Sequence, residues 1–418
     1  MSSAKLLQNV DLLLGESFEL VKTTDLLLES GKIRGIGSSY DRVRSNTTRI
    51  DCKKLLAIPG FINAHTHIGD SVAMDLGIGS GLEQLVHPVS GAKTRILSKT
   101  SHRRLIEGMK SSISDMIACG TTTFVDFREG GLIGAGLLKK ALGIYPSIRA
   151  IILGRPISHL DIERGDAENT SRTHPSSDSL EELNQLLDIC DGLGVSGPNE
   201  FTSASLNQLS TITQHRKKLI GTHAAEASSS VEFSHEHFAE SEVNRAIAQL
   251  RPNFLVHLTN ATQDDINMVI REKIPVICCP RANAILGLGF PPLSDLVRRG
   301  SLVSLGTDNV MLNSPDILRE MDFTSKMMRA TAKNPSEIDS LEILKMVTVN
   351  PSRIFGLEDQ VGSIDEGKNA DLVLLDMTKP NVTNTLDVIG TIVHRIRQDN
   401  VASVYFNGNL VKGSYKRN

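Results

Sequence analysis

The stretch FINAHTHIGD, residues 61–70, follows the apolar run LLAIPG and places two histidines one residue apart. If residues 55–63 lead into a β-strand, His65 and His67 project from the same face, because side chains alternate in direction along a strand. Two neighbouring imidazoles suit a metal ion, for which neutral histidine is the commonest protein ligand. A His-x-His pair also arises by chance in a chain with 12 histidines, so the rest of the sequence must supply the remaining ligands.

Seven further short runs rich in β-branched residues follow, and most of the intervals between them hold an amphipathic stretch. The runs are GTTTFVDF (120–127), IRAIILGRP (148–156), GLGVSGP (192–198), KLIGTHAAE (218–226), NFLVHLTN (253–260), PVICCPR (275–281) and LVSLGTDN (302–309). Alternation of strand and helix predicts a parallel sheet, and eight repeats predict a closed (β/α)8 TIM barrel, an α/β fold. A doubly wound open sheet is disfavoured, because no glycine fingerprint follows the first strand.

Both ends of the chain have a different sequence pattern, in which short apolar runs are separated by turn residues. DLLLESGKIRGIG near the start and VASVYFNGNLVKG near the end are typical of small antiparallel strands. We therefore expect a small β-sandwich domain built from both termini, residues 1–57 plus 359–418. It would accompany a barrel domain of residues 58–358.

Composition limits the classes of function. Hydrophobic residues make up 40% and charged residues 22% of the 418 residues, as is usual for a globular protein, and a net charge of −3 offers no basic surface for nucleic acid. No apolar run reaches about 18 residues, and the first residues lack a basic start followed by an apolar core, so neither a membrane span nor a signal peptide is expected. Five cysteines without paired spacing predict reduced, buried thiols in a cytoplasmic protein.

The residues that end the predicted strands test the metal hypothesis, because chemistry in a TIM barrel collects at the C-terminal ends of its strands. The first strand ends in His65 and His67, the fifth in His223, the sixth in His257 and the eighth in Asp308. Each residue taken singly is also consistent with a hydrogen-bonded position on the barrel rim. Together they match a catalytic site that holds a divalent ion with one open position, Zn²⁺ foremost, with Fe²⁺ as the alternative.

Five motifs in one order resemble the amidohydrolase superfamily: PGFINAHTH, THAAE, LVHLTN, the run from CCPR to GTDN, and NPSRIFGLEDQVGSIDEGKNADLVLLD. Within it, the sequence is similar to the aminohydrolase branch of cytosine, guanine and adenosylhomocysteine deaminases and s-triazine chlorohydrolases. The resemblance covers most of the chain and implies a barrel that carries a β-sandwich formed from both termini. It also implies a metal-dependent hydrolase of non-peptide carbon–nitrogen bonds, with homo-oligomers, dimers or larger, common among such relatives.

The resemblance implies a role for each strand-end residue. The ligands of one metal ion per chain would be His65, His67, His223 and Asp308. His257 would be a partner of the substrate or of the metal-bound water. Glu226 completes a His-x-x-Glu motif with His223, which marks the deaminase branch. Relatives with two metals carry a bridging lysine at the end of the fourth strand, and GVSGPNEF has none, so one metal is favoured.

The chemistry of these groups indicates a reaction. A bound metal lowers the pKa of water to roughly 7 and makes hydroxide available for attack on an sp² ring carbon. Asp308 and His257 could take up and orient the proton of that water, and Glu226 could protonate the adjacent ring nitrogen and then the departing ammonia. The predicted function is hydrolytic deamination of a small polar amino-substituted heterocycle of the purine, pyrimidine, pterin or nucleoside type. Opening of a cyclic amide and s-triazine chlorohydrolase or aminohydrolase activity remain alternatives, whereas the complete ligand set disfavours a catalytically silent binding protein.

Further polar residues at strand ends are predicted to face the substrate, with two more on the long segment 68–100, whose length is typical of a lid or binding loop. They are Arg128, Glu129, Arg155, Asn199, Glu200 and Arg281, together with Lys93 and Arg95 of the segment. As a group they favour a polar heterocycle, anionic ones included, over an apolar one. The alternative is that they form ion pairs at the barrel rim.

Two further details of the sequence carry expectations. A second His-x-His pair, His235 and His237, lies in a helical pattern, where residues two apart point in different directions and cannot chelate together. We expect this pair on a solvated helix face. The eighth strand ends in GTDN, where the adenosylhomocysteine deaminases tend to have GTDG.

Overall fold

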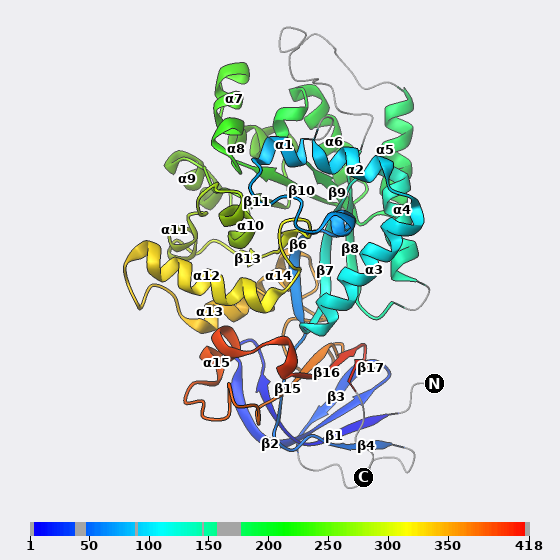
Figure 1. Cartoon of the computed structure of the whole chain (residues 1–418), viewed down its shortest axis with the longest axis vertical. Helices are drawn as coiled ribbons and strands as arrows, with labels where there is room; N and C mark the ends of the chain where they lie inside the picture. Colours follow the sequence, from blue (N-terminus) through cyan, green and yellow to red (C-terminus); the bar gives the residue numbers. More distant parts are fainter. Residues whose placement is uncertain (1–3, 38–46, 88–90, 144–145, 157–176, 414–418) are drawn as a thin grey trace.

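The computed structural model of the chain describes residues 4–37, 47–87, 91–143, 146–156 and 177–413. Its centre is a parallel sheet with the strand order β13-β12-β11-β10-β9-β8-β7-β6-β14 (Figure 1). The strands are β6 (Phe61–His67), β7 (Thr121–Arg128), β8 (Arg149–Gly154), β9 (Gly192–Val195), β10 (Leu219–Ala224), β11 (Phe254–His257), β12 (Val276–Cys278), β13 (Val303–Leu305) and β14 (Asp308–Asn309). Each of the eight runs predicted from the sequence contains a strand of this sheet, and the last run contains two.

The two ends of this sheet belong to one stretch of chain, because only Gly306 and Thr307 separate β13 from β14. β13 pairs with β12, whereas β14 pairs in parallel with β6, with Asp308 opposite Thr66. The side chain of Asn63 on β6 joins the same contact, donating to the Thr307 hydroxyl at 2.8 Å and accepting from the Thr307 N–H at 3.0 Å. The sheet therefore curls until its last strand lies beside its first, which gives a TIM-barrel-like α/β fold.

Alternate side chains of the strands separate into two apolar clusters, as the period of two along a strand requires. On β8, Ile151 and Leu153 join one cluster, whereas Ile152 between them joins the other. On β12, Ile277 belongs to the first cluster and Val276 to the second. Both faces of the sheet are thus covered, which explains why its strands read as near-continuous apolar runs. All five cysteines are buried and free, as the sequence predicts.

Helices fill most of the intervals between strands and surround the sheet (Figure 1). They are α3 (His102–Ala118), α4 (Gly131–Leu142), α5 (Ser177–Ile189), α6 (Ser203–His215), α7 (Ser228–Phe238), α8 (Glu242–Arg245) continued by η3 (Ala246–Leu250), α9 (Gln263–Arg271), α10 (Pro280–Ile285), α11 (Leu293–Arg298), α12 (Ile317–Ala332), α13 (Ser340–Lys345) and α14 (Val349–Ile354). His235 and His237 are both exposed on α7, so the prediction of a solvated helix face is confirmed. Among the described residues, no helix is both long and apolar enough to cross a membrane.

The long segment after β6 folds into three short helices, η1 (Ile68–Ala73), α1 (Leu82–Val86) and α2 (Ala92–Lys99), with residues 88–90 outside the described ranges. Another short helix, η2 (Pro198–Glu200), follows β9. Both segments leave the C-terminal ends of their strands. They are therefore in position to build the walls of a site above the sheet.

A second sheet takes its strands from both ends of the chain and lies below the first in Figure 1. Its strands are β1 (Lys5–Leu14), β2 (Glu19–Glu29), β3 (Lys32–Ile36), β4 (Thr48–Asp51), β5 (Leu55–Pro59), β15 (Leu372–Asp376), β16 (Val401–Phe406) and β17 (Asn409–Lys412), accompanied by α15 (Val388–Arg395) and η4 (Gln398–Asn400). β15 pairs with β5, which joins the two ends of the chain, and Leu7, Leu26, Leu372 and Tyr405 contribute to a core of its own. These eight strands form one hydrogen-bonded sheet, and the domain boundaries at residues 57 and 359 stay a prediction.

The close approach of β6 and the strand that closes the sheet leaves no room for a side chain at Gly306. A Cβ there would lie 2.6 Å from the Cβ of His65 and 2.7 Å from its backbone nitrogen, so we expect Gly306→Ala to lower the free energy of unfolding by about 1–3 kcal/mol in urea denaturation. Gly136→Ala in α4 is the control, because a Cβ there meets nothing within 4 Å and alanine favours a helix by roughly 0.5–1 kcal/mol. A Gly306 variant as stable as the Gly136 variant would contradict this close approach.

Candidate active site

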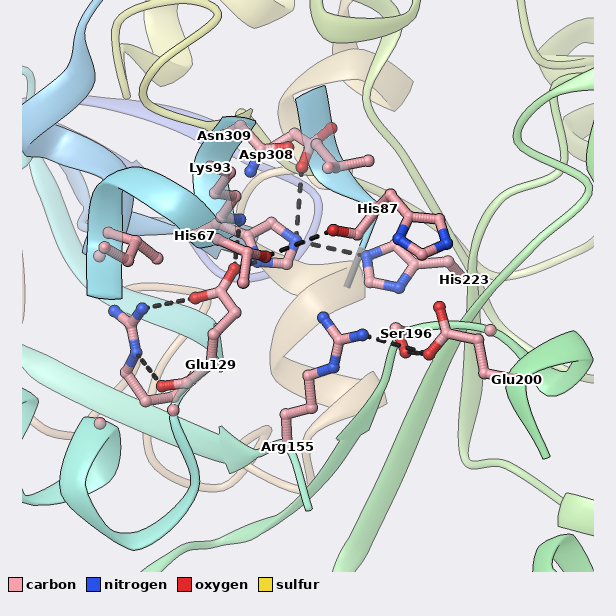
Figure 2. Close-up of a pocket in the computed structure, with 18 of the residues that line it drawn as sticks. His67, His87, Lys93, Glu129, Arg155, Ser196, Glu200, His223, Asp308 and Asn309 are labelled. Carbon is pink, nitrogen blue, oxygen red and sulfur yellow. Dashed lines mark hydrogen bonds and ion pairs between the residues drawn. The ribbon is translucent and has the colours of Figure 1, made fainter. Parts of the chain in front are cut away.

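A cavity of about 530 Å³ lies at the C-terminal ends of the strands of the parallel sheet (Figure 2). Its volume is within the range of sites for small molecules. Polar residues from the ends of β6, β7, β10, β11 and β14 line one part, among them His67, Glu129, His223, His257 and Asp308. Helices α2, α3 and α4 add an apolar wall that includes Leu97, Leu105, Met109, Ile133 and Leu137.

The four predicted metal ligands converge at the base of this cavity. The Nε2 atom of His223 lies 3.3 Å from the Nε2 atoms of both His65 and His67. The Oδ1 atom of Asp308 lies 3.4 Å from the Nε2 atom of His65 and 3.6 Å from that of His67. Two ligands of a tetrahedral zinc ion with Zn–N bonds of roughly 2.0–2.1 Å stand about 3.3–3.4 Å apart, so these spacings match such a site.

The hydrogen bonds of the Nδ1 atoms of His67 and His223 favour a cation at this point. The Nδ1 atom of His67 faces the Phe127 carbonyl at 3.1 Å and a Glu129 carboxylate oxygen at 2.8 Å, and that of His223 faces the Val195 carbonyl at 3.1 Å. These oxygens only accept, so each Nδ1 carries the proton and each Nε2 carries a lone pair. Lone pairs that face one another and a carboxylate oxygen repel unless a cation lies between them. The donor set therefore fits a divalent metal ion.

The protonation states of the ligands agree with this conclusion. Burial lowers the pKa of His65 to about 3 and holds that of His223 well below its usual range, so both imidazoles are neutral. Burial alone would raise the pKa of Asp308, but the hydrogen bond with His65 and the neighbouring histidine side chains together bring it below its usual value. Neutral imidazoles and an ionised carboxylate are the forms in which these side chains bind metals.

His257 and Glu226 lie at the edge of this ligand set. The Nε2 atom of His257 is 3.6 Å from the Oε2 atom of Glu226, and its Nδ1 atom faces the side-chain amide of Asn283 at 3.2 Å. Burial, followed by the nearby carboxyl groups of Asp308 and Glu242, raises the pKa of Glu226 well above its usual range. Glu226 therefore holds its proton up to a higher pH than an exposed carboxyl group does.

Two side chains that sequence reasoning missed hold the loop between His223 and Glu226. Ala225 has the unusual φ of 49°, and its N–H donates to a carboxyl oxygen of Glu242 at 2.8 Å. Asn260 holds the carbonyl groups of the same loop. Its backbone N–H donates to the Ala225 carbonyl and its side-chain amide donates to the Glu226 carbonyl, both at 2.7 Å. Asn260 ends the LVHLTN motif and could have been singled out, whereas Glu242 lies in a charge-rich helical stretch that carries no such signal.

A network of buried charges lies beside His67 and centres on Glu129, which pairs with both Lys93 and Arg128 (Figure 2). Burial alone would raise the pKa of Glu129, but Lys93, Arg128 and His67 hold it well below its usual range. Lys93 comes from α2, so the network joins the 68–100 segment to a predicted metal ligand. A second carboxylate, Asp70, lies 3.5 Å from the Lys93 ammonium group.

The asparagine that distinguishes GTDN from GTDG has a structural partner. The Asn309 side-chain amide donates to Asp70 at 2.8 Å, and the Met311 N–H donates to the other Asp70 oxygen at 3.2 Å. Because Asp70 is fully buried, these bonds attach the start of the 68–100 segment to the strand that closes the sheet. The Asn309 side chain therefore anchors the cavity wall in this chain.

The remaining predicted substrate contacts divide into two groups. Arg155, Asn199 and Glu200 line the cavity, as do Lys93, Arg128 and Glu129. Two residues, Arg95 and Arg281, do not line it. Arg95 is exposed on α2, and Arg281 is held by Glu320 at 3.5 Å and by the Ser314 carbonyl at 3.3 Å. Their sequence positions near a strand end or in a long loop did not reveal which way their side chains point.

Comparison with known proteins agrees with this geometry. The model of the "Amidohydrolase family" matches residues 56–411, which is most of the chain. The chain belongs to the amidohydrolase family. As a member of that family, it is a hydrolase that acts on carbon–nitrogen bonds.

Relatives of this amidohydrolase extend over nearly its whole length. An uncharacterized protein of Methanocaldococcus jannaschii is 37% identical over 95% of this chain and 96% of its own. A 5-methylthioadenosine/S-adenosylhomocysteine deaminase of Caldanaerobacter subterraneus is 26% identical over 97% of this chain and 92% of its own. The crystal structure of a zinc-bound adenosine deaminase of Xanthomonas campestris superposes with a TM-score of 0.83 at 20% identity, covering 98% of this chain and 92% of that one. That structure supports the TIM-barrel-like fold.

The buried carboxyl group of Glu242 makes the stability of the amidohydrolase depend on pH. Burial raises the pKa of Glu242 to about 7, although its bonds with Ala225 and Ser230 act in the opposite direction. The folded state thus holds this proton more tightly than the unfolded state, and the resulting stability is present at low pH and lost as the pH rises towards 7. Between pH 5 and 8 we expect the wild type to lose about 2–3 kcal/mol more free energy of unfolding than Glu242→Gln, taking roughly 1.4 kcal/mol per pKa unit. Glu232→Gln, at an exposed position on the neighbouring helix α7, should show the same pH dependence as the wild type in urea denaturation. If the free energy of unfolding depended on pH in the same way in all three proteins, the raised pKa of Glu242 would be refuted.

Proposed function

We propose that the protein is a zinc-dependent hydrolytic deaminase of a small amino-substituted heterocycle, of the purine, pyrimidine, pterin or nucleoside type, with one metal ion per chain. The observation that carries the proposal is the convergence of His65, His67, His223 and Asp308 on one point, with the carboxyl group of Glu226 at its edge. The deaminase relatives support the reaction class. They do not identify the substrate.

The metal ion supplies a hydroxide nucleophile when it is bound, because it lowers the pKa of a coordinated water to roughly 7. The residues of the chain orient the ligands and transfer protons. His67 and His223 are held in the required tautomer by Glu129 and two backbone carbonyls. Ligands oriented in this way by their own hydrogen bonds need little rearrangement when the ion binds.

Glu226 carries the proton chemistry of the proposal. Attack on an amino-bearing ring carbon leaves negative charge on the adjacent ring nitrogen, and ammonia leaves poorly unless it is protonated. A carboxyl group with a raised pKa can donate its proton to the ring nitrogen, take up the remaining proton of the attacking water as the carbonyl forms, and donate that proton to the leaving amine. His257, 3.6 Å from Glu226 and held by Asn283, is placed to orient the attacking water.

The direct test is ammonia release by the purified, zinc-loaded protein from a panel of purines, pyrimidines, pterins and their nucleosides. Release from one class, accompanied by the corresponding oxo product, is the expected result. Ring opening without ammonia would favour the cyclic amide alternative. No reaction with any member of the panel would overturn the proposal.

The metal assignment predicts close to one zinc ion per chain by elemental analysis. Asp308→Ala should abolish turnover while the circular dichroism spectrum stays unchanged, because the cores of the two sheets do not depend on the metal. Asp264→Ala, at an exposed position of α9, should keep full activity. Two metal ions per chain, or an Asp308 variant that is unfolded, would contradict a single catalytic metal.

If Glu226 transfers protons to the ring nitrogen and the leaving amine, as a proton shuttle, Glu226→Gln should lower kcat by roughly 10²–10⁴-fold, the usual contribution of positioned acid–base catalysis. Zinc content should stay unchanged, since glutamine keeps the shape of the side chain and Glu226 is not a proposed ligand. Glu236→Gln, exposed on α7, is the matched control. Full activity of the Glu226 variant would exclude the shuttle and favour a reaction that does not protonate a ring nitrogen.

A further inference from the structure

The cationic side chains that line the cavity share one property, which is that each is paired with a carboxylate. Lys93 contacts Glu129 and Asp70, and Arg128 contacts Glu129 and Asp126. The third is Arg155, which contacts Glu200. The described residues of the cavity lining include no further lysine or arginine. The rim ion pairs considered as the alternative to anion recognition are therefore present.

The pair of Arg155 and Glu200 is the one that a substrate can reach. The Arg155 and Glu200 side chains are 17% and 21% exposed, against 7% for Lys93 and 4% for Arg128. Arg155 follows β8 and Glu200 ends η2, so two neighbouring strands present them side by side. In Figure 2 the guanidinium group points towards Glu200 and Ser196, with His67 and His223 above it in the view.

The contacts within this pair leave it neutral overall but polar. An Arg155 N–H donates to the Oε2 atom of Glu200 at 3.1 Å, and the Ser196 hydroxyl donates to the same oxygen. Because that carboxylate lies against the guanidinium group, a second anion entering the cavity meets attraction from one and repulsion from the other. A charged group without its own partner loses hydration when it enters a cavity, and this loss is not compensated here. An uncharged ring edge can still use the donor and the acceptor.

We propose that Glu200 determines the charge specificity of the site: by neutralising Arg155 it restricts the enzyme to amino-heterocycles without an anionic substituent. This inference rests on the proposed deaminase function and deepens it by naming the substrate class. It narrows the expectation of a polar heterocycle, anionic ones included, to those without an anionic substituent. Glu200 acts here through Arg155 and does not take part in the chemical step.

The test compares substrates that differ only by an anionic group: adenosine with adenosine 5′-monophosphate, cytidine with cytidine 5′-monophosphate, guanosine with guanosine 5′-monophosphate, and pterin with 6-carboxypterin. We expect the wild type to release ammonia from the uncharged member of at least one pair with a kcat/KM at least 100-fold higher than from the anionic member. Glu200→Gln should reduce that ratio at least tenfold, because Arg155 is then free to pair with the anion. The increase in kcat/KM of the Glu200→Gln protein for the anionic substrate should become smaller as salt is added, because salt screens an ionic contact.

Two further variants separate charge from structure. Glu200→Asp keeps the carboxylate and should keep the discrimination, and circular dichroism checks that both Glu200 variants fold. Glu272→Gln removes an equivalent Arg–Glu contact, with Arg271 at 2.9 Å, on the exposed end of α9, and should leave the ratio unchanged. Equal rates for both members of a pair in the wild type, or an unchanged ratio in a folded Glu200→Gln protein, would overturn this inference alone. Absence of ammonia from every compound would overturn the deaminase proposal and this inference with it.

Discussion

The site depends on the pairing of β14 with β6, which closes the parallel sheet. That pairing sets Asp308 opposite Thr66, between the two histidines of the His-x-His motif, although these residues are far apart in the sequence. His223 reaches the same point from the middle of the sheet, and only a sheet that curls on itself can bring its first, fifth and eighth strands together. Asp308 has a φ of 62° and His257 a φ of 79°, so the backbone departs from regular strand geometry where these side chains are presented. Strained backbone of this kind persists where the surrounding structure holds it, and it clusters at functional sites.

Around this closure, buried charges connect the predicted metal site to the cavity walls. Glu129 contacts His67, Lys93 and Arg128, so one carboxylate joins a predicted metal ligand, the 68–100 segment and a barrel strand. Removing one member of such a buried network leaves an uncompensated charge, which typically costs several kcal/mol. The stability of the wall and the geometry of the metal ligands are therefore coupled. The Arg155–Glu200 pair is more exposed, and its role in the proposed mechanism is the selection of substrate.

Local patterns in the sequence were sufficient to predict the strands and to single out side chains that the structure brings together. The eight apolar runs could be recognised as strands because their residue pattern is local. His65, His67, His223 and Asp308 could be expected to lie close together because a TIM barrel gathers strand ends at one face. Residues whose importance depends on the direction of a side chain could not be found. Asn283 and Glu242 have no distinctive sequence context, yet they hold His257 and the loop that carries Glu226. Arg95 and Arg281 had a favourable context and point elsewhere.

The sequence by itself determined the alternation of strands and helices, the strand-end positions of the predicted metal ligands and the family of the chain, because these follow from residue order and short-range periodicity. The tertiary structure decided which nitrogens of the histidines converge at the predicted metal site, which carboxylates neutralise the lysine and the arginines of the cavity, and how the last strand meets the first. These properties depend on distances of a few ångströms between residues that lie far apart along the chain. Coulombic energies and hydrogen bonds change steeply over such distances, and a residue pattern contains no measure of them.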